Sequence, residues 1–106
     1  MLSDNESSKF LALLLTFTTV LGMSDRSVAN LFGLSHKTVS RWMGAARLAA
    51  AGEPVPQYRI YHHLASEVSK KVTYLMKVTN PAQLTSIPSR ADRLQSLKDA
   101  LSKRSV

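Results

Sequence analysis

Cysteine is absent from this chain of 106 residues. Its absence excludes a disulfide framework and any zinc site built on cysteine ligands, and it fits a protein kept in a reducing cytosol. Long apolar runs are absent too, because the most apolar stretch, residues 10–20, is too short for a membrane span and is interrupted by threonines. Since acidic Asp4 and Glu6 precede this stretch, it lacks the pattern of a signal peptide. We therefore expect a cytoplasmic protein without a membrane partner.

Glycine and proline are scarce, with four of each, so their positions are informative. Pro54 and Pro56 make the clearest break, because proline disrupts a helix interior and moves the preceding residue out of the α region. The length suits one compact domain. We predict that it is built from two regions, residues 1–53 and residues 54–106.

Acidic residues are few, with seven Asp and Glu against fourteen Lys and Arg, and the net charge is +7. The pI of about 10.2 exceeds the value typical of nucleic-acid binders. Residues 26–52 contain no acidic residue but hold Arg26, Lys37, Arg41 and Arg47. This segregation favours a surface that faces nucleic acid. Charge alone is equally consistent with a basic protein that has no such partner.

Two short helices joined by a tight turn are predicted in residues 25–44. Ser24 and Ser35 are suitable N-caps, because a serine hydroxyl can accept an unpaired backbone N–H. Gly33, between them, supplies the positive φ that a sharp turn needs. The residues expected to point inward are Val28, Ala29, Phe32, Leu34, Val39 and Trp42.

At these residues the chain resembles the helix-turn-helix family of phage and bacterial transcription regulators. Ala29 falls at the small-residue position of the first helix, and Gly33 falls at the turn glycine. The five apolar positions of the motif are filled by Val28, Phe32, Leu34, Val39 and Trp42. The resemblance implies that the second helix enters the major groove of double-stranded DNA.

The resemblance also assigns residues to this contact. Lys37 and Arg41 lie four apart on one helix face, and Arg41 could fork onto the O6 and N7 of guanine. Arg26, Thr38 and Arg47 are expected to hold the phosphate backbone. The complete set of predicted DNA-binding residues is Arg26, Ser35, His36, Lys37, Thr38, Ser40, Arg41 and Arg47.

A helix is also predicted on the N-terminal side, over residues 1–23, with a capping box formed by Ser3 and Glu6 and a C-cap at Gly22. Its apolar stripe comprises Phe10, Leu13, Leu14, Phe17, Val20 and Leu21. The stripe would cover the back of the helix-turn-helix, with a possible surplus for a partner. The second motif helix is expected to continue to about Ala51 and to end at Gly52.

The C-terminal region, residues 54–106, has two interpretations. Apolar spacing favours one long helix over residues 57–79, whereas β-branched and aromatic content would also allow a wing hairpin from residues 58–61 and 72–78. Residues 82–88 are predicted to be a loop, and residues 89–103 a last helix. The seam of that helix is Ala91, Leu94, Leu97 and Leu101. The whole is thus predicted to be an all-α bundle, with residues 57–103 forming a homodimer contact.

No catalytic site is evident, because the chain has no Gly-rich phosphate loop, no suitably paired carboxylates and no nucleophile–base set. His62 and His63 invite a metal interpretation. Adjacent helical residues point about 100° apart, however, and only Glu67 is nearby as a further ligand. We therefore expect a protein that is not an enzyme and that needs no metal or cofactor.

The resulting hypothesis is a phage or bacterial transcription regulator, either repressor or activator, that binds an inverted-repeat operator as a dimer. Its recognition helices would then lie about 34 Å apart. One alternative is a nucleoprotein assembly factor, such as a small terminase-like protein or a replication or partition adaptor. Another is a basic module that binds RNA polymerase or a different host protein.

Overall fold

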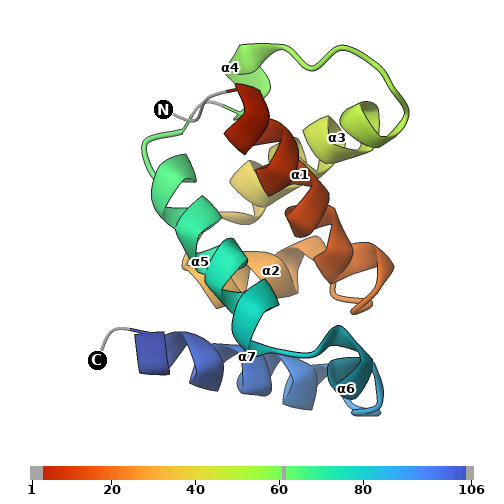
Figure 1. The fold of residues 1–106 in the computed structure, drawn as a ribbon, viewed down its shortest axis with the longest axis vertical. Helices are drawn as coiled ribbons and strands as arrows, with labels where there is room; N and C mark the ends of the chain where they lie inside the picture. Colours follow the sequence, from red (N-terminus) through yellow and green to blue (C-terminus); the bar gives the residue numbers. More distant parts are fainter. Residues whose placement is uncertain (1–3, 61, 105–106) are drawn as a thin grey trace.

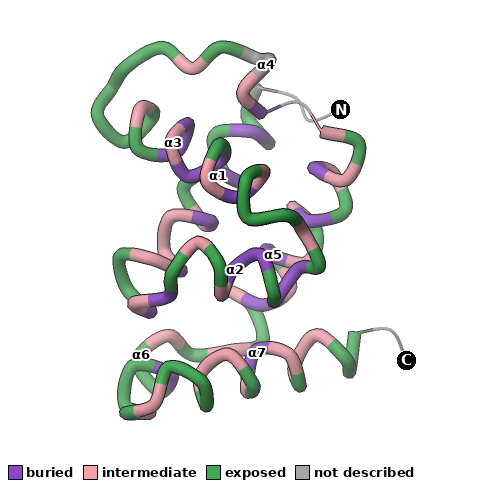
Figure 2. Tube along the Cα trace, turned by 180° about the vertical axis from the view of Figure 1, so that it is seen from behind, coloured by how far each residue is buried: buried purple, intermediate pink, exposed green. Residues whose placement is uncertain are grey.

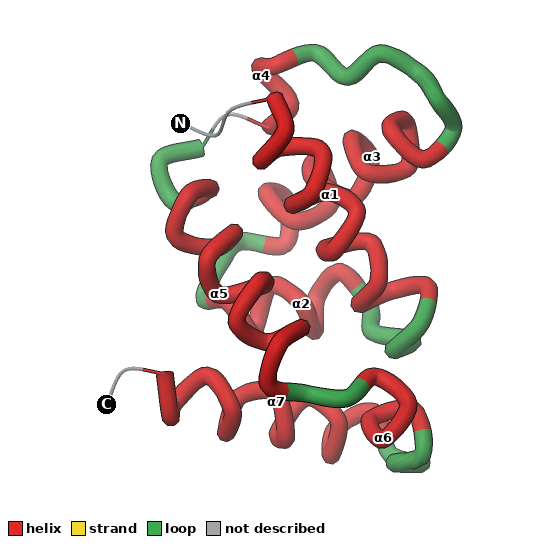
Figure 3. The backbone as a smooth tube through the Cα atoms, viewed as in Figure 1, coloured by secondary structure: helices red, strands yellow, loops and turns green. Residues whose placement is uncertain are grey.

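The computed structural model describes residues 4–60 and 62–104, and within them every regular element is a helix and no strand occurs (Figure 3). In chain order the helices are α1 (Asp4–Thr19), α2 (Asp25–Phe32), α3 (His36–Ala50), α4 (Gln57–Ile60), α5 (Ala65–Val78), α6 (Pro81–Thr85) and α7 (Arg90–Arg104). They pack into one body of 35 × 30 × 23 Å (Figure 1). The all-α prediction is confirmed.

Helix α1 lies across the back of the α2–α3 pair (Figure 1). The ring of Phe10 meets Trp42 of α3 edge to face at 5.3 Å between centroids, and Phe17 meets Phe32 of α2 in the same way at 5.7 Å. Such edge-to-face pairs add specificity to the apolar burial. The prediction that the α1 stripe covers the back of these two helices is therefore confirmed.

The predicted end of α1 is wrong. The helix ends at Thr19 instead of residue 23, and Val20, assigned to the stripe, is 47% exposed. Hydroxyls of the last-turn threonines donate to carbonyls of the preceding turn, which competes with continued helix. Gly22 then turns the chain with a φ of 66°. The predicted cap Ser3 lies outside the described residues.

The caps and turn of the α2–α3 pair are those predicted. Ser24 Oγ accepts the N–H of Ser27, and Ser35 Oγ accepts the N–H of Thr38. Gly33 has a φ of 67°, in the left-handed region that glycine adopts without steric cost. Helix α3 ends at Ala50, next to Gly52 with its positive φ, close to the predicted end.

The predicted single helix over residues 57–79 is wrong, and so is the alternative hairpin, because α4 and α5 occupy this range with a break between them. A continuous helix would bond the Leu64 N–H to the Ile60 carbonyl. Instead, that carbonyl accepts the indole N–H of Trp42 at 3.2 Å, and the Leu64 N–H donates to Nδ1 of His62 at 3.1 Å. A tertiary contact thus interrupts the helix. Tyr61 lies outside the described residues.

The predicted loop over residues 82–88 contains the short helix α6, capped by Asn80, whose Oδ1 accepts the Ala82 N–H. Helix α7 follows at nearly its predicted bounds and packs on α5 and α2. In Figure 2 most of α7 is exposed or half-buried, with Leu97 as its buried position. Ala91, predicted in the apolar seam, is exposed, because that seam contacts the bundle only farther along the helix.

Candidate nucleic-acid interface

Over residues 36–47, helix α3 presents one narrow outer strip and packs its opposite side into the core, whereas Ala49 and Ala50 at its C-terminal end are exposed away from the strip. Its inward residues Val39, Trp42, Met43, Ala45 and Ala46 are all buried. The outer strip consists of His36, Lys37, Ser40, Arg41, Gly44 and Arg47, of which Ser40 and Gly44 are half-buried and the other four exposed. Because α3 packs against α1, α2 and α4, the direction in which its strip faces is fixed by the fold.

Trp42 holds α3 in this orientation. Its side chain is fully buried, between the Phe10 ring of α1 and the His62 ring, whose centroid lies 5.6 Å away. Its indole N–H donates to the Ile60 carbonyl at the end of α4. A residue tied to several elements at once resists rotation of the helix that carries it. Trp42 therefore belongs to the core and is not a surface stacking residue.

Ser35 and Thr38 form the first-turn cap of α3. Besides accepting the Thr38 N–H at 3.2 Å, Ser35 Oγ lies 2.9 Å from the Thr38 hydroxyl. Ser35 is exposed and Thr38 is half-buried. Both were predicted to contact DNA. In this arrangement their hydroxyls already organise the helix N-terminus, so any further contact would be made by oxygen atoms held in fixed positions.

Ser40 was predicted to face outward. Its hydroxyl instead takes part in a hydrogen-bond network between α2 and α3. Its hydroxyl donates to Oδ2 of Asp25 at 3.2 Å and lies 3.3 Å from Nε2 of His36. The network ties the first turn of α2 to α3 and sets the position of the His36 ring. It also places a carboxylate beside the predicted DNA-facing strip. Sequence reasoning missed Asp25, because no pattern links two residues fifteen apart.

The His62–His63 pair also lies beside the strip, and the sequence patterns did not place it there. The rings of His62 and His63 stack at 4.4 Å, and Leu64 donates its N–H to His62 Nδ1. Burial, the neighbouring His63 and the positive charge of Arg41 together lower the pKa of His62 from its ordinary 6.5. The Arg41 charge therefore acts on the segment between α4 and α5. No group of three His, Cys, Asp or Glu residues in the described part of the chain is arranged to hold a metal ion.

The remaining predicted residues are solvent-exposed cations at the ends of the motif. Arg26 lies in the first turn of α2 and Arg47 in the last turn of α3. Lys37 lies at the other end of α3, which has no acidic residue in its first turn. The geometry is thus a helix bearing cations along its length and capped by neutral hydroxyls.

No protein-family model, curated protein or solved structure matches this chain. None of the described helices is both long and apolar enough to cross a membrane. The likeness to helix-turn-helix regulators accordingly stays a prediction.

Proposed function

We propose that α2 and α3 form a helix-turn-helix that binds double-stranded DNA, with the outer strip of α3 in the major groove. The observation that carries this proposal is the strip itself. It bears Lys37, Arg41 and Arg47 on a helix without acidic residues, and the residues opposite the strip are buried from Val39 to Ala46. Cations on a protruding helix neutralise phosphates, and the major groove is wide enough to admit an α-helix.

Each cation has a specific role in this mechanism. Arg41 forks onto a guanine, while Lys37 reaches a neighbouring base or phosphate. Arg26 and Arg47, at the ends of the motif, grip phosphates and set the register of the protein on the duplex. The Asp25–Ser40–His36 network keeps the two helices in a fixed relative position, so that these contacts form together.

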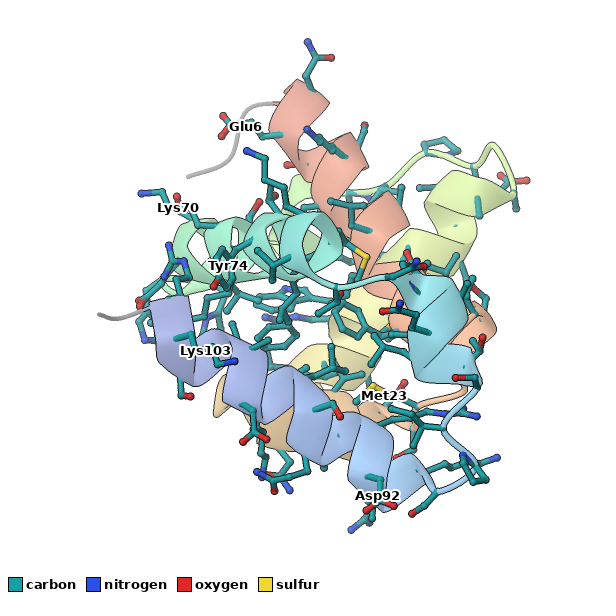
Figure 4. The ribbon with its side chains drawn as sticks, turned by 60° about the horizontal axis from the view of Figure 1, so that its bottom comes forward. Glu6, Met23, Lys70, Tyr74, Asp92 and Lys103 are labelled. Atoms are coloured by element: carbon teal, nitrogen blue, oxygen red, sulfur yellow. The ribbon has the colours of Figure 1, made fainter. Side chains whose placement is uncertain are left out.

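The test is the affinity of purified variants for duplexes enriched by the wild-type protein from a random-sequence pool. Lys37→Ala with Arg41→Ala should lower the affinity at least a hundredfold, on the order of two lost charged contacts. The matched control removes the same charge as Lys70→Ala with Lys103→Ala, on α5 and α7 (Figure 4). Lys70 lies in a groove beside α1, which covers the inward side of α3. If both double variants lose the same affinity for DNA, the binding is non-specific charge attraction and the proposal is wrong.

That the protein is a dimeric transcription regulator is a more specific prediction than DNA binding. The α7 seam that suggested a dimer contact packs on α5 and α2 of the same chain. Among the described large apolar side chains, Val20 and Val78 are the exposed ones. Sedimentation with and without DNA tests the prediction: a monomer in both conditions would contradict the dimer. A ring of many copies would favour the nucleoprotein assembly factor instead.

A further inference from the structure

Gly44 occupies an unfavourable place for a glycine, in the interior of α3. Glycine loses more backbone freedom on folding than any other residue and weakens a helix interior relative to alanine. Two kinds of contact favour glycine at such a position: close packing within the chain, or the close approach of a ligand to the backbone.

The packing of the chain supplies no such contact. A Cβ atom built on Gly44 meets nothing within 4 Å, so the fold has room for a side chain. Nor does the backbone require glycine, since the glycines with positive φ in the described residues are Gly22, Gly33 and Gly52. Alanine would therefore fit at position 44 without displacing any atom.

The position of Gly44 on the helix points to an external contact. Residues three apart on an α-helix are offset by about 60° around the axis, so Arg41 and Arg47 flank Gly44 on opposite sides. Lys37 lies two turns earlier, nearly in line with it. Gly44 is thus the middle of the outer strip, a bare stretch of main chain between two exposed arginines.

We infer that Gly44 is the point at which the main chain of α3 comes closest to duplex DNA. Arg41 would reach the base edges on one side of it, and Arg47 would reach the phosphates on the other. Without a Cβ, the helix surface can approach the groove wall, and both arginines then contact DNA at once. This inference rests on the proposed function and adds a positioning residue to it.

The experiment compares Gly44→Ala and Gly44→Leu with the wild type in two measurements. The first is urea unfolding of the free protein. Because alanine is the better helix former and meets no atom, Gly44→Ala should lower the unfolding equilibrium constant about fivefold. The second is affinity for the duplexes that the wild type enriches from a random pool. There Gly44→Ala should bind about tenfold more weakly, because a methyl group would intrude on a closely packed contact, and Gly44→Leu weaker still.

Ala49→Leu is the matched control, since Ala49 is exposed on the same helix but is turned away from the strip. It should bind with wild-type affinity. A Gly44→Ala protein that is more stable and binds DNA as tightly as the wild type would overturn the role of Gly44 while leaving DNA binding intact. Absence of DNA binding by the wild type would overturn the proposed function, and this inference with it.

Discussion

A single side chain, Trp42, links the predicted interface to the core. Its ring is buried between Phe10 and His62, and its N–H is bonded to the Ile60 carbonyl. Leaving that carbonyl unpaired would cost about 1–3 kcal/mol. Because Arg41 directly precedes Trp42 in α3, the position of its guanidinium depends on how Trp42 packs. The packing on the inward side of α3 therefore determines where the side chains on its outward side lie.

The two exposed arginines of α3 should respond differently to truncation. Arg47→Ala should weaken DNA binding uniformly across sequences and reduce the slope of log affinity against log salt by about 0.9, since one phosphate contact is lost. Arg41→Ala should cost about 1–3 kcal/mol and relax the preference at one base pair. Salt titrations on two duplexes that differ at that base pair measure both effects. If Arg41→Ala and Arg47→Ala show the same salt slope and the same base-pair preference, the assigned division between base and phosphate contacts is incorrect.

At the scale of elements, the break between α4 and α5 shows what periodicity could not predict. The apolar spacing from Leu64 through Val68, Val72 and Leu75 is helical, and the last three residues do share the buried side of α5, which begins just after Leu64. The spacing continues across the break, however, and so predicted a single helix. The break depends on the bond between Trp42 and Ile60, eighteen residues apart, which no local pattern encodes.

The junction between α4 and α5 should make stability depend on pH. His62 has a folded pKa below 6.5, and its Nδ1 must be unprotonated to accept the Leu64 N–H. The unfolded chain therefore binds more protons, so stability is fully present above pH 6.5 and is lost as the pH falls through the folded pKa. Urea midpoints between about pH 7.5 and about pH 5 measure this decline.

His62→Asn is the informative variant, because an amide oxygen can replace Nδ1 as acceptor but does not titrate. It should flatten the decline, whereas His63→Asn, which keeps the titrating ring of His62, should retain most of it. An unchanged decline in His62→Asn would assign the pH dependence to other groups.

Arg93 fastens α7 to the rest of the bundle. Its guanidinium donates to the carbonyls of Leu21, Thr85 and Ile87, at 2.9, 3.0 and 2.7 Å. Arg93→Met should lower the free energy of unfolding by about 2 kcal/mol, because these carbonyls lose a charged donor. Arg90→Met removes an exposed arginine from the same helix and should change it by less than about 0.5 kcal/mol. Equal effects in urea unfolding would mean that the three hydrogen bonds contribute little.

At the scale of the whole molecule, the features predicted from sequence were those set by local chemistry. The caps Ser24 and Ser35, the turn at Gly33 and the inward residues of α2 and α3 follow from residue type and spacing. The candidate nucleic-acid interface was less predictable. Its exposed cations follow from helical periodicity, but Asp25 and His62 join it through contacts between distant segments.

The overall arrangement separates two functions of the chain. Helix α1 packs on α3, α7 packs on α2, and α5 packs behind them on α1 and α7, whereas the outer strip of α3 is the surface that we propose meets DNA. The net charge of +7 would draw the molecule toward DNA from any direction, whereas the strip would determine how it docks.

The central claim is that this strip, and not positive charge in general, meets DNA. It is tested most directly by NMR titration of isotope-labelled protein with a duplex enriched from a random pool. We predict that the backbone amide signals of residues 36–47 and of the first turn of α2 shift most, while those of α6 and α7 stay in place. Shifts concentrated on α5 to α7, with α3 unaffected, would contradict it.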